Sequence, residues 1–402
     1  MRKKDRRINL LCLLLLLLLT ASGCKAPSGQ SVKLEEKTAE ETASSEGKAP
    51  APAKRWEELK LDHQMELSYA SQFSINYYEG GFTELSIQDG RRYLVVPEGA
   101  VCPQGLPENM TVICRPLENI YLAATSAMDL FRSLSGLDAI TLSGTDVSGW
   151  YLEEARAALN DGRMRYAGKY NAPDYELILS AGSDLAIEST MIYHSPEVKE
   201  QLETLGIPVL IERSSYETHP LGRMEWVRLY GVLLGKEELA EACFKEQCDR
   251  LEPVLTQEQT GKTVAFFYVT SKGSVNVRKP GDYVSNMIEL AGGSYVPQIP
   301  VESENALSTM NMQMEAFYAA AKDADYLIYN STIDGELNSL DELFEKSSLF
   351  ADFRAVKEGH VWCTGQNLFQ ETMGLGTMIQ DIHRMLTEEE DPAQMTYLHQ
   401  LQ

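Results

Sequence analysis

The spacing of apolar residues divides the chain into regions with different predicted secondary structure. Leu67–Tyr77, Phe82–Ile87 and Arg91–Val96 are short β-prone runs separated by glycine-containing turns, a pattern that predicts an antiparallel meander. From Met110 onward, short apolar runs alternate with stretches of helical periodicity. Because strands that alternate with helices normally form parallel sheets, this part of the chain predicts an α/β fold.

The predicted elements of the α/β region fall into two groups. Strands are expected at Thr111–Cys114, Ala139–Leu142, Asp184–Glu188 and Pro208–Glu212 in the first group, and at Thr263–Val269, Asp325–Tyr329 and His360–Cys363 in the second. Helices of the second group are expected near Asp282–Ala291, Met312–Ala321, Leu340–Phe344 and Met373–Leu386. We therefore expect an α/β protein of two lobes, each with a central, mostly parallel sheet flanked by helices.

A helical segment lies between the two groups. Pro220–Leu234 has apolar residues at helical spacing, with a proline suited to the first turn and Gly235 suited to the C-cap. A second helix is expected over Glu237–Leu251, ending before Pro253. A single long interdomain helical segment would restrict hinge motion, because bending it breaks several backbone hydrogen bonds at once. Large closure of the lobes is not expected.

The N-terminus has the features of an export signal. Five basic residues precede an apolar stretch at positions 10–19, which is too short to span a bilayer stably. Three small residues then lead to Cys24, an arrangement that resembles the lipobox of bacterial lipoproteins, in which the cysteine takes a diacylglycerol and becomes the new N-terminus. An ordinary cleaved secretion signal is the alternative.

These patterns set the expected domain boundaries. Residues 1–23 are a predicted signal peptide, and 24–55 a lipidated, disordered tether, because that segment has few large apolar side chains. The N-terminal lobe covers 56–219 and includes the antiparallel opening segment. The remaining boundaries are 220–252 for the interdomain helical segment, 253–390 for the C-terminal lobe and 391–402 for a C-terminal tail.

The amino-acid composition excludes some classes of function. The 402 residues include 36 Lys plus Arg and 59 Asp plus Glu, a net charge of −23. Removal of the five basic residues and one acid before Cys24 would leave 31 and 58, a net charge of −27. Such an acidic chain lacks the basic surface that nucleic acid requires. With 44% hydrophobic residues and a mean hydropathy of −0.26, a protein with many membrane spans is also excluded.

Cysteine and histidine spacing predicts neither a metal centre nor a catalytic site. Five cysteines follow Cys24, an odd number, and none forms a CxxC motif or a Cys/His cluster. A disulfide between Cys102 and Cys114 stays open as an alternative. The chain has no GxSxG, HExxH, GxGxxG or P-loop signature. We therefore expect no cofactor and no enzymatic activity.

The two lobes share a repeated sequence feature. In the first lobe, Glu176 begins an apolar helix that leads to Asp184 and a buried strand; in the second lobe, Glu315 begins an apolar helix that leads to Asp325 and a buried strand. One glutamate at a helix start has little meaning, since it can simply favour the helix dipole. A matched pair of glutamates indicates a shared role in the two lobes.

Several motifs resemble one family. They are the lipobox-like end, Ala167–Tyr170 followed by Glu176, the strand Asp184–Ile187, the strand entry Gly206–Val209, Arg223–Trp226 on the connecting helix, and Glu315 ahead of Asp325–Ile328. Together they resemble the substrate-binding lipoproteins of ABC importers for iron–siderophore complexes, haem and cobalamin, over roughly residues 110–386. The resemblance implies two lobes joined by one long helix, capture of a small-molecule metal chelate, preferably an iron–siderophore, and delivery to an ABC permease dimer. It also implies that Glu176 and Glu315 meet arginines of the permease.

Candidate ligand-binding residues follow predicted strand ends, because ligands of open α/β sheets bind beyond the carboxyl ends of the strands. Aromatic rings offer flat apolar walls, and Lys or Arg would neutralise an anionic chelate. The candidates are Trp150, Tyr151, Lys169, Tyr170, Ser189, Tyr216, His219, Arg278, Trp362 and Gln366. We expect an extracytoplasmic monomer, anchored to the cell membrane by the lipid on Cys24.

Two other functions are compatible with the sequence. A surface lipoprotein could bind a protein or glycan partner through the aromatic residues of the opening segment. A metal-chelate-processing enzyme would share the fold class, but such enzymes act inside the cell. A ligand-induced change in absorbance or tryptophan fluorescence would favour the importer component over both.

Overall fold

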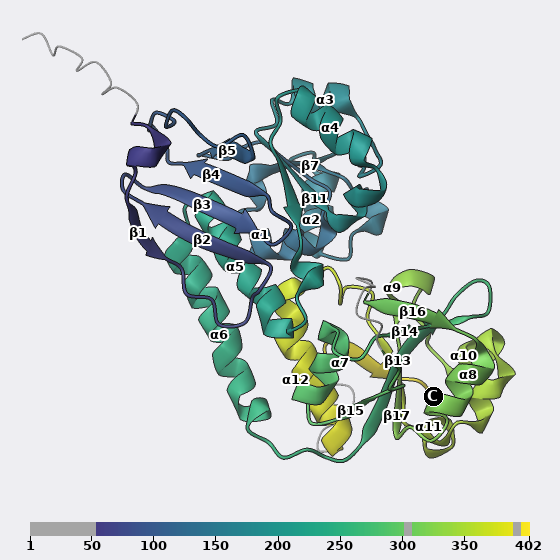
Figure 1. Ribbon diagram of the computed structural model, residues 1–402. Coiled ribbons are helices and arrows are strands. Elements are labelled where there is room, and N and C mark those ends of the chain that lie inside the picture. The colour runs from purple at the N-terminus through teal and green to yellow at the C-terminus, as the bar shows by residue number, and fades with distance from the viewer. Residues whose placement is uncertain (1–53, 301–307, 389–394) are drawn as a thin grey trace, which may run out of the picture. The chain divides into compact units, whose positions relative to one another are not determined.

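The computed structural model describes residues 54–300, 308–388 and 395–402, and Ala51–Gln402 form one compact unit (Figure 1). The predicted signal peptide, Cys24 and nearly all of the tether lie outside the described residues. None of the helices in the described ranges is long and apolar enough to cross a membrane.

The opening segment forms a five-stranded sheet of its own. After a 3-10 turn at Trp56–Glu58, its strands are β1 (Leu61–Gln64), β2 (Phe73–Tyr78), β3 (Phe82–Ile87), β4 (Arg92–Val96) and β5 (Met110–Cys114). β2, β3 and β4 pair antiparallel, as predicted for the meander. β1, which was not predicted, pairs antiparallel with β2, and the predicted run Leu67–Tyr77 is strand only from Phe73 onward. The assignment of Thr111–Cys114 to the α/β sheet was wrong, because β5 pairs parallel to β4 in the opening sheet. An apolar run indicates that a strand is buried, but it does not indicate which strand it pairs with.

The first lobe also contains a parallel α/β sheet. Its strands, in spatial order, are β12 (Val209–Glu212), β11 (Leu185–Ser189), β6 (Ile120–Leu122), β7 (Ile140–Ser143) and β8 (Arg165–Tyr166). All four pairings are parallel, which confirms the α/β prediction. The central strand β6 was missed, because three residues are too few to show a periodicity. A two-stranded hairpin, β9 (Gly168–Lys169) and β10 (Ala172–Pro173), follows β8.

Short helices connect the strands of this lobe. The α-helices are α1 (Met128–Ser133), α2 (Glu153–Asn160), α3 (Tyr175–Ser180) and α4 (Pro196–Thr204). The 3-10 turns lie at Thr125–Ala127, Leu137–Ala139, Val147–Gly149, Thr190–His194 and Ser214–Tyr216.

The second lobe has one seven-stranded mixed sheet. Its main order is β16 (Thr309–Met312), β14 (Val275–Arg278), β13 (Thr263–Val269), β17 (Tyr326–Tyr329), β18 (Val361–Thr364) and β19 (Leu398–Gln400). β15 (Ser294–Val296) pairs in parallel with the start of β13, while β14 pairs antiparallel with its end. The expected C-terminal tail differs from the structure, since β19 pairs antiparallel with β18.

The helices of the second lobe are α7 (Tyr283–Leu290), α8 (Met314–Ala321), α9 (Ser331–Asp334), α10 (Leu340–Lys346), α11 (Arg354–Glu358) and α12 (Leu375–Thr387), with 3-10 turns at Ser348–Asp352 and Thr372–Gly374. Four of them, α7, α8, α10 and α12, agree with the predicted positions to within a few residues, whereas the short helices α9 and α11 were not predicted.

Two consecutive helices connect the lobes. α5 (Pro220–Leu234) begins and ends as predicted, with Gly235 in the left-handed conformation at its C-cap. α6 (Glu237–Leu255) passes through Pro253, where the predicted helix ended. Pro253 lies in the last turn of α6, so its missing N–H removes only one hydrogen bond and the helix ends two residues later. α5 packs against α1, α6, α7 and α12 and is buried almost throughout.

One hydrophobic core crosses the boundary between the lobes. It contains Phe73 and Tyr93 of the opening sheet, Trp226 of α5, Phe266 of the second-lobe sheet and Met378 of α12, all at most 5% exposed. Smaller cores lie on the other faces of the three sheets. The lobes therefore share packing as well as a connecting helix, which agrees with the expectation of limited hinge motion.

All five cysteines of the described residues are free thiols. Cys102 is partly buried and Cys114 is exposed, and the disulfide left open between them is not formed.

Candidate ligand-binding and docking site

The two matched glutamates hold the same helical position in the two lobes. Glu176 is the second residue of α3 and Glu315 is the second residue of α8, and both are exposed. α3 leads into β11 and α8 into β17, each inside its lobe's sheet. Both carboxylates are thus free of the core and available to a partner.

The aspartates that follow these helices also correspond. Oδ2 of Asp184 accepts hydrogen bonds from the backbone N–H groups of Glu118 and Asn119 at 2.8 and 3.1 Å, just before β6. Oδ2 of Asp325 accepts from the backbone N–H and the hydroxyl of Thr263 at the start of β13, both at 2.8 Å. In each lobe, an aspartate therefore ties its own strand to the beginning of the neighbouring parallel strand.

The environment of Asp325 favours its charged form. Burial alone would raise the pKa of its carboxyl, but the hydrogen bonds from Thr263 and the guanidinium of Arg354 at 2.6 Å hold that pKa below its ordinary value. The ionised carboxylate is the better hydrogen-bond acceptor, so the strand connection is strongest near neutral pH.

A glycine shapes the hairpin that carries Lys169 and Tyr170. Gly168 has a φ of +83°, and a Cβ at this position would lie 2.4 Å from the carbonyl oxygen of Ala172. The hydroxyl of Tyr121 donates to the carbonyl of Gly168 at 3.0 Å and holds the hairpin against the sheet. Lys169 is exposed and Tyr170 half-buried, so both side chains are accessible to a ligand.

Tyr216 belongs to a cluster that sequence reasoning did not find. The guanidinium of Arg213 lies over the Tyr216 ring, 4.2 Å from its centroid, and donates to the hydroxyl of Tyr193 at 2.8 Å. That hydroxyl donates in turn to Asp89, in the turn between β3 and β4. Gln72 also accepts from Arg213. The opening sheet therefore reaches the strand ends of the α/β sheet, a contact no local pattern could have predicted.

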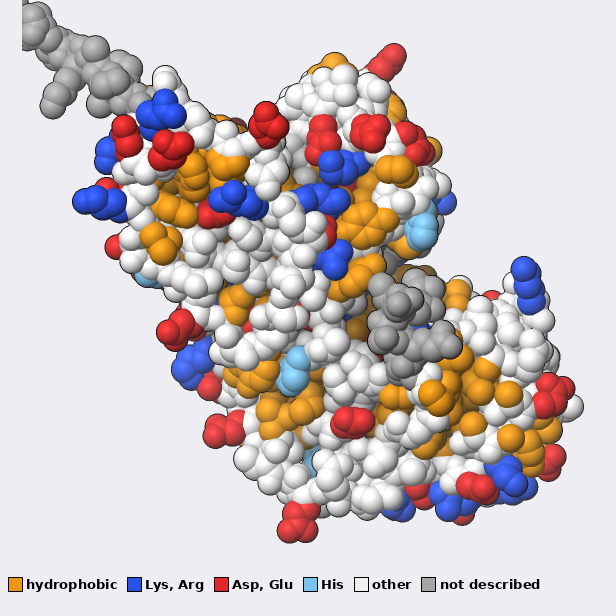
Figure 2. Space-filling view, in the orientation of Figure 1, with side chains coloured by type: hydrophobic (Ala, Val, Ile, Leu, Met, Phe, Trp, Pro, Cys, Tyr) orange, Lys and Arg blue, Asp and Glu red, His pale blue; other side chains and the backbone are white. Residues whose placement is uncertain are grey.

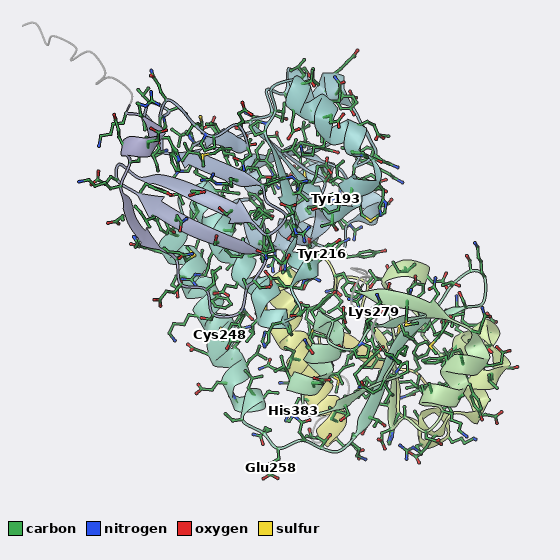
Figure 3. The ribbon with its side chains drawn as sticks, in the orientation of Figure 1. Tyr193, Tyr216, Cys248, Glu258, Lys279 and His383 are labelled. Atoms are coloured by element: carbon green, nitrogen blue, oxygen red, sulfur yellow. The ribbon has the colours of Figure 1, made fainter. Side chains whose placement is uncertain are left out.

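The figures place these side chains near the boundary of the lobes. Tyr193 and Tyr216 lie on the first-lobe side and Lys279 on the second-lobe side (Figure 3). The space-filling view shows a hollow between the lobes, with apolar side chains on the nearby surface of the first lobe (Figure 2). Tyr151 and Tyr193 are among the exposed large hydrophobic residues, at 44% and 38%.

Two of the predicted ligand residues have structural roles. Trp150 is 1% exposed, and its indole N–H donates to Ser143 and to the carbonyl of Thr145, each at 3.1 Å. Nδ1 of His219 accepts from the backbone N–H of Leu221 and so caps α5, and burial lowers the pKa of its imidazole. These contacts weigh against direct ligand contact by Trp150 and His219.

Trp362 lies away from the carboxyl ends of the strands. It is the second residue of β18 and is 5% exposed. It lines a pocket of about 360 Å³ with Tyr326, the first residue of β17. The pocket is therefore near the amino ends of these parallel strands, whereas Gln366, half-buried, follows the carboxyl end of β18.

The remaining predicted residues lie at strand ends or at the lobe boundary. Ser189 ends β11 and caps the following turn by accepting from Met191. Arg278 ends β14, forms an ion pair with Asp282 and lies 5.0 Å from the ring centroid of Tyr283.

Hydrogen bonds across the lobe boundary fix the backbone around Tyr151. The side chain of Gln370, from the segment after β18, accepts from the backbone N–H of Tyr151 at 2.8 Å and donates to the carbonyl of Gly149 at 2.7 Å. Buried Asp129 of α1 accepts from the backbone N–H of Met373 at 2.7 Å. These bonds connect the lobes a second time, besides α5 and α6.

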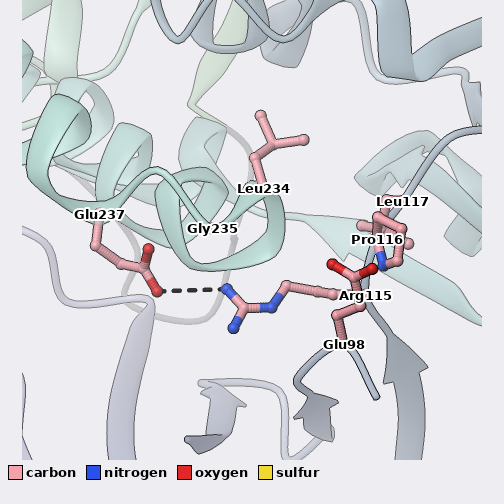
Figure 4. A pocket seen from close by; sticks show the side chains of 7 residues that line it. All are labelled: Glu98, Arg115, Pro116, Leu117, Leu234, Gly235 and Glu237. Carbon is pink, nitrogen blue, oxygen red and sulfur yellow. Dashed lines mark ion pairs between the residues drawn. The ribbon is translucent and has the colours of Figure 1, made fainter.

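Another pocket, of about 400 Å³, lies at the corner between α5 and α6. It is lined by Glu98, Arg115, Pro116, Leu117, Leu234, Gly235 and Glu237 (Figure 4). Arg115 forms an ion pair with Glu237 at 3.5 Å and donates to the carbonyl of Val232, so its charge is already neutralised. In the described part of the chain, no group of three His, Cys, Asp or Glu residues is placed to hold a metal ion.

Comparison with known proteins agrees with this architecture. The family model for periplasmic binding proteins matches residues 134–368. The chain belongs to this family. Its members are binding proteins, so this periplasmic binding protein is not an enzyme, in agreement with the absence of catalytic motifs.

Relatives and solved structures extend the comparison. An uncharacterized lipoprotein of Methanocaldococcus jannaschii is 23% identical over 329 residues, which are 78% of this chain and 77% of that protein. A periplasmic haem-binding protein of Pseudomonas aeruginosa has a TM-score of 0.54 at 18% identity, covering 71% of this chain and 98% of that one. A periplasmic catecholate-siderophore-binding protein of Vibrio cholerae has a TM-score of 0.51 at 16% identity, covering 66% and 92%. These structures share the fold of this chain.

Proposed function

We propose that this periplasmic binding protein is the lipid-anchored, extracytoplasmic solute-binding component of an ABC importer. It captures a metal chelate between its lobes and delivers it to a permease dimer. The observation that carries the proposal is the correspondence of Glu176 and Glu315, which occupy the same exposed helical position in two lobes of the same architecture. A pair of equivalent carboxylates suits a partner with two equivalent subunits.

Several features support a metal chelate as the ligand. The accessible side chains that follow strands of the first lobe include tyrosines and a cation, namely Tyr151, Tyr216 and Lys169. Such groups combine flat apolar surface with positive charge, which suits a tetrapyrrole or a catecholate complex. The haem- and siderophore-binding proteins of the same fold support the same class, and an iron–siderophore is our preferred ligand.

Exposed carboxylates suit docking because they can accept the guanidinium fork of arginine without prior burial. Glu176 and Glu315 form no ion pair with the described residues, so the arginines of a permease would meet no internal competitor. Both carboxylates lie on helices that pack on the sheets. With rigid lobes, the distance between the two carboxylates is therefore fixed.

The docking role is tested by charge reversal. Glu176→Lys and Glu315→Lys should each abolish cellular uptake, because a lysine opposite an arginine costs several kcal/mol. Ligand affinity of the purified variants should stay within about twofold of the unmodified protein, since neither residue is proposed to contact ligand. Glu200→Lys, an exposed position on α4, is the matched control and should keep uptake.

Two outcomes would contradict the proposal. Normal uptake by both Glu176→Lys and Glu315→Lys would remove the docking role. Loss of ligand binding in step with uptake would place the two glutamates in the ligand site or in the folding core instead.

A further inference from the structure

Two free thiols belong to the outer face of the opening sheet, the face turned away from the core that the lobes share. Cys114 is the last residue of β5 and is exposed, while Cys102 lies between β4 and β5 and is partly buried. Cys102 and Val112 both pack against the small core on this outer face. Because side chains two residues apart on a strand point to the same face, Cys114 faces the same side as Val112.

The path of the chain brings the two thiols to the same end of the sheet. β4 and β5 are parallel, so the crossover 97–109 must return from the carboxyl end of β4 to the amino end of β5. Val96, the last residue of β4, is the register partner of Cys114. Glu98, at the start of the crossover, lines one pocket together with Arg115, the residue after Cys114 (Figure 4). The crossover therefore begins beside the end of β5.

The two thiols also affect each other electrostatically. Burial raises the pKa of the Cys102 thiol, and the negative charge of the Cys114 thiolate raises this pKa further. Two charges influence each other measurably only over a short distance, so this effect agrees with the positions of the two residues on the sheet. Cys114 is the thiol that an oxidant in solution can reach, and Cys102 is the shielded thiol of the pair.

The other three cysteines of the described ranges are not placed to form a bond. Cys363 is 0% exposed in β18, and burial raises the pKa of its thiol to about 12, so its reactive thiolate hardly forms. Cys243 and Cys248 are five residues apart on α6, which points their side chains about 140° apart around the helix axis. Cys102 and Cys114 are therefore the one pair in this part of the chain that the fold brings together on one surface.

We propose that Cys102 and Cys114 are a disulfide-forming pair, whose bond closes the crossover 97–109 over the outer face of the opening sheet. The oxidant is another disulfide. The Cys114 thiolate attacks it and releases one thiol, and the Cys102 thiolate then attacks the mixed disulfide and releases the second thiol. One protein disulfide and two oxidant thiols result, so two electrons and two protons pass from the protein to the oxidant.

This inference goes beyond the proposed function. Disulfide oxidants are typical of the space outside the cytoplasm, where the proposed function requires the protein to act. The bond itself needs only the two thiols and the oxidant, so purified protein is sufficient for the test.

The first experiment maps the bond by mass spectrometry. Purified full-length protein is incubated with increasing ratios of oxidised to reduced glutathione, and the remaining thiols are then alkylated. Cleavage after Glu98, Glu108 and Glu118 separates the two cysteines into peptides 99–108 and 109–118, which stay joined only by a disulfide. We expect the joined peptides to appear as the ratio rises and to separate on reduction.

Single substitutions test the order of the two steps. In Cys102→Ser, the exposed Cys114 should stop at the mixed disulfide with glutathione, because the second thiol is missing. In Cys114→Ser, the shielded Cys102 should remain open to alkylation. Cys248→Ser is the matched control and should form the joined peptides as the unmodified protein does. Glutathione held on Cys114 of the unmodified protein while Cys102 stays free would overturn the inference, as would peptide 109–118 joined only to its own copy.

The second experiment measures the melting temperature before and after oxidation. A bond that closes a loop restricts the unfolded chain, so the oxidised protein should melt several degrees higher than the reduced protein. Cys114→Ser should melt at the same temperature under both conditions. A melting temperature that fails to rise after complete oxidation would mean that the two sulfurs meet only in a distorted protein, and would overturn the inference.

The outcomes are separate from those of the proposed function. Neither experiment uses ligand binding or uptake as a readout, so absence of the bond would leave the importer function standing. Loss of the docking role of Glu176 and Glu315 would likewise leave the thiol pair unaffected.

Discussion

Glu217 and Glu225 together accept hydrogen bonds from the backbone N–H groups of five consecutive residues, 68 to 72, at 2.7 to 2.9 Å. Both glutamates are buried, at 2% and 0% exposure. Glu217 precedes α5 and also accepts from the indole N–H of Trp226, while Glu225 lies within α5. The loop between β1 and β2 is therefore fixed to the connecting helix, and the opening sheet is an integral part of the first lobe.

This arrangement predicts a large loss of stability in Glu225→Gln. The amide lacks the charge and has only one accepting oxygen, so a buried backbone N–H loses its acceptor. We expect the free energy of unfolding to fall by about 2–4 kcal/mol, measured by chemical denaturation. Glu203→Gln, which removes only the i,i+4 pair with Lys199 on α4, should change it by less than about 0.5 kcal/mol. Equal effects of the two substitutions would contradict the anchoring role.

The burial of Glu188 predicts that the free energy of unfolding depends on pH. It lies in β11, is 0% exposed, and neither carboxylate oxygen has a hydrogen-bond partner in the described residues. Burial raises the pKa of its carboxyl to about 8. Between the ordinary pKa of glutamate and pH 8, the unfolded chain is ionised while the folded protein holds the proton, so stability falls as pH rises through this range.

The variant Glu188→Gln removes this titration. We expect the melting temperature of the unmodified protein to fall relative to that of Glu188→Gln between about pH 5 and pH 8, with the difference constant above the folded pKa. Asp129 and Asp381, whose pKa values burial also raises, contribute equally to both proteins and cancel in the comparison. Parallel pH profiles would show that Glu188 titrates normally.

The shared core predicts only small movement of the lobes. Closure would have to bend α6 and break the bonds from Gln370 to residues 149 and 151 and from Asp129 to Met373. Small-angle scattering with and without ligand should therefore give nearly equal radii of gyration. A large decrease on ligand addition would contradict the rigid connection.

The N-terminal signal predicts a lipid anchor at Cys24. Cys24→Ser should move the protein from the membrane fraction to the soluble or unprocessed pool, because the apolar stretch is expected to be cleaved off and no helix in the described residues is long and apolar enough to cross a membrane. Cell fractionation with immunoblotting measures this, and Cys102→Ser is the matched control. Undiminished membrane association of correctly processed Cys24→Ser would contradict lipidation.

The predicted elements were most accurate where each element's own periodicity carried the information. Periodicity was enough to predict the α/β class, the bounds of α5 and the meander from β2 to β4. The matched positions of Glu176 and Glu315 could be predicted too, because each depends only on where its own helix begins. Periodicity reports which face of an element is buried, and that is a property of neighbouring residues.

Tertiary structure decided the features that depend on partners distant in sequence. The sequence could not assign β5 to the opening sheet, separate buried Trp150 from exposed Tyr151, or find the contact of Arg213 with Tyr193 and Gln72. It could not distinguish Arg223, which pairs with no acid among the described residues, from Arg228 on the same helix, which pairs with two. The physical reason is that hydrogen bonds and ion pairs act over a few ångströms in space, and only the folded chain brings such residues within that distance.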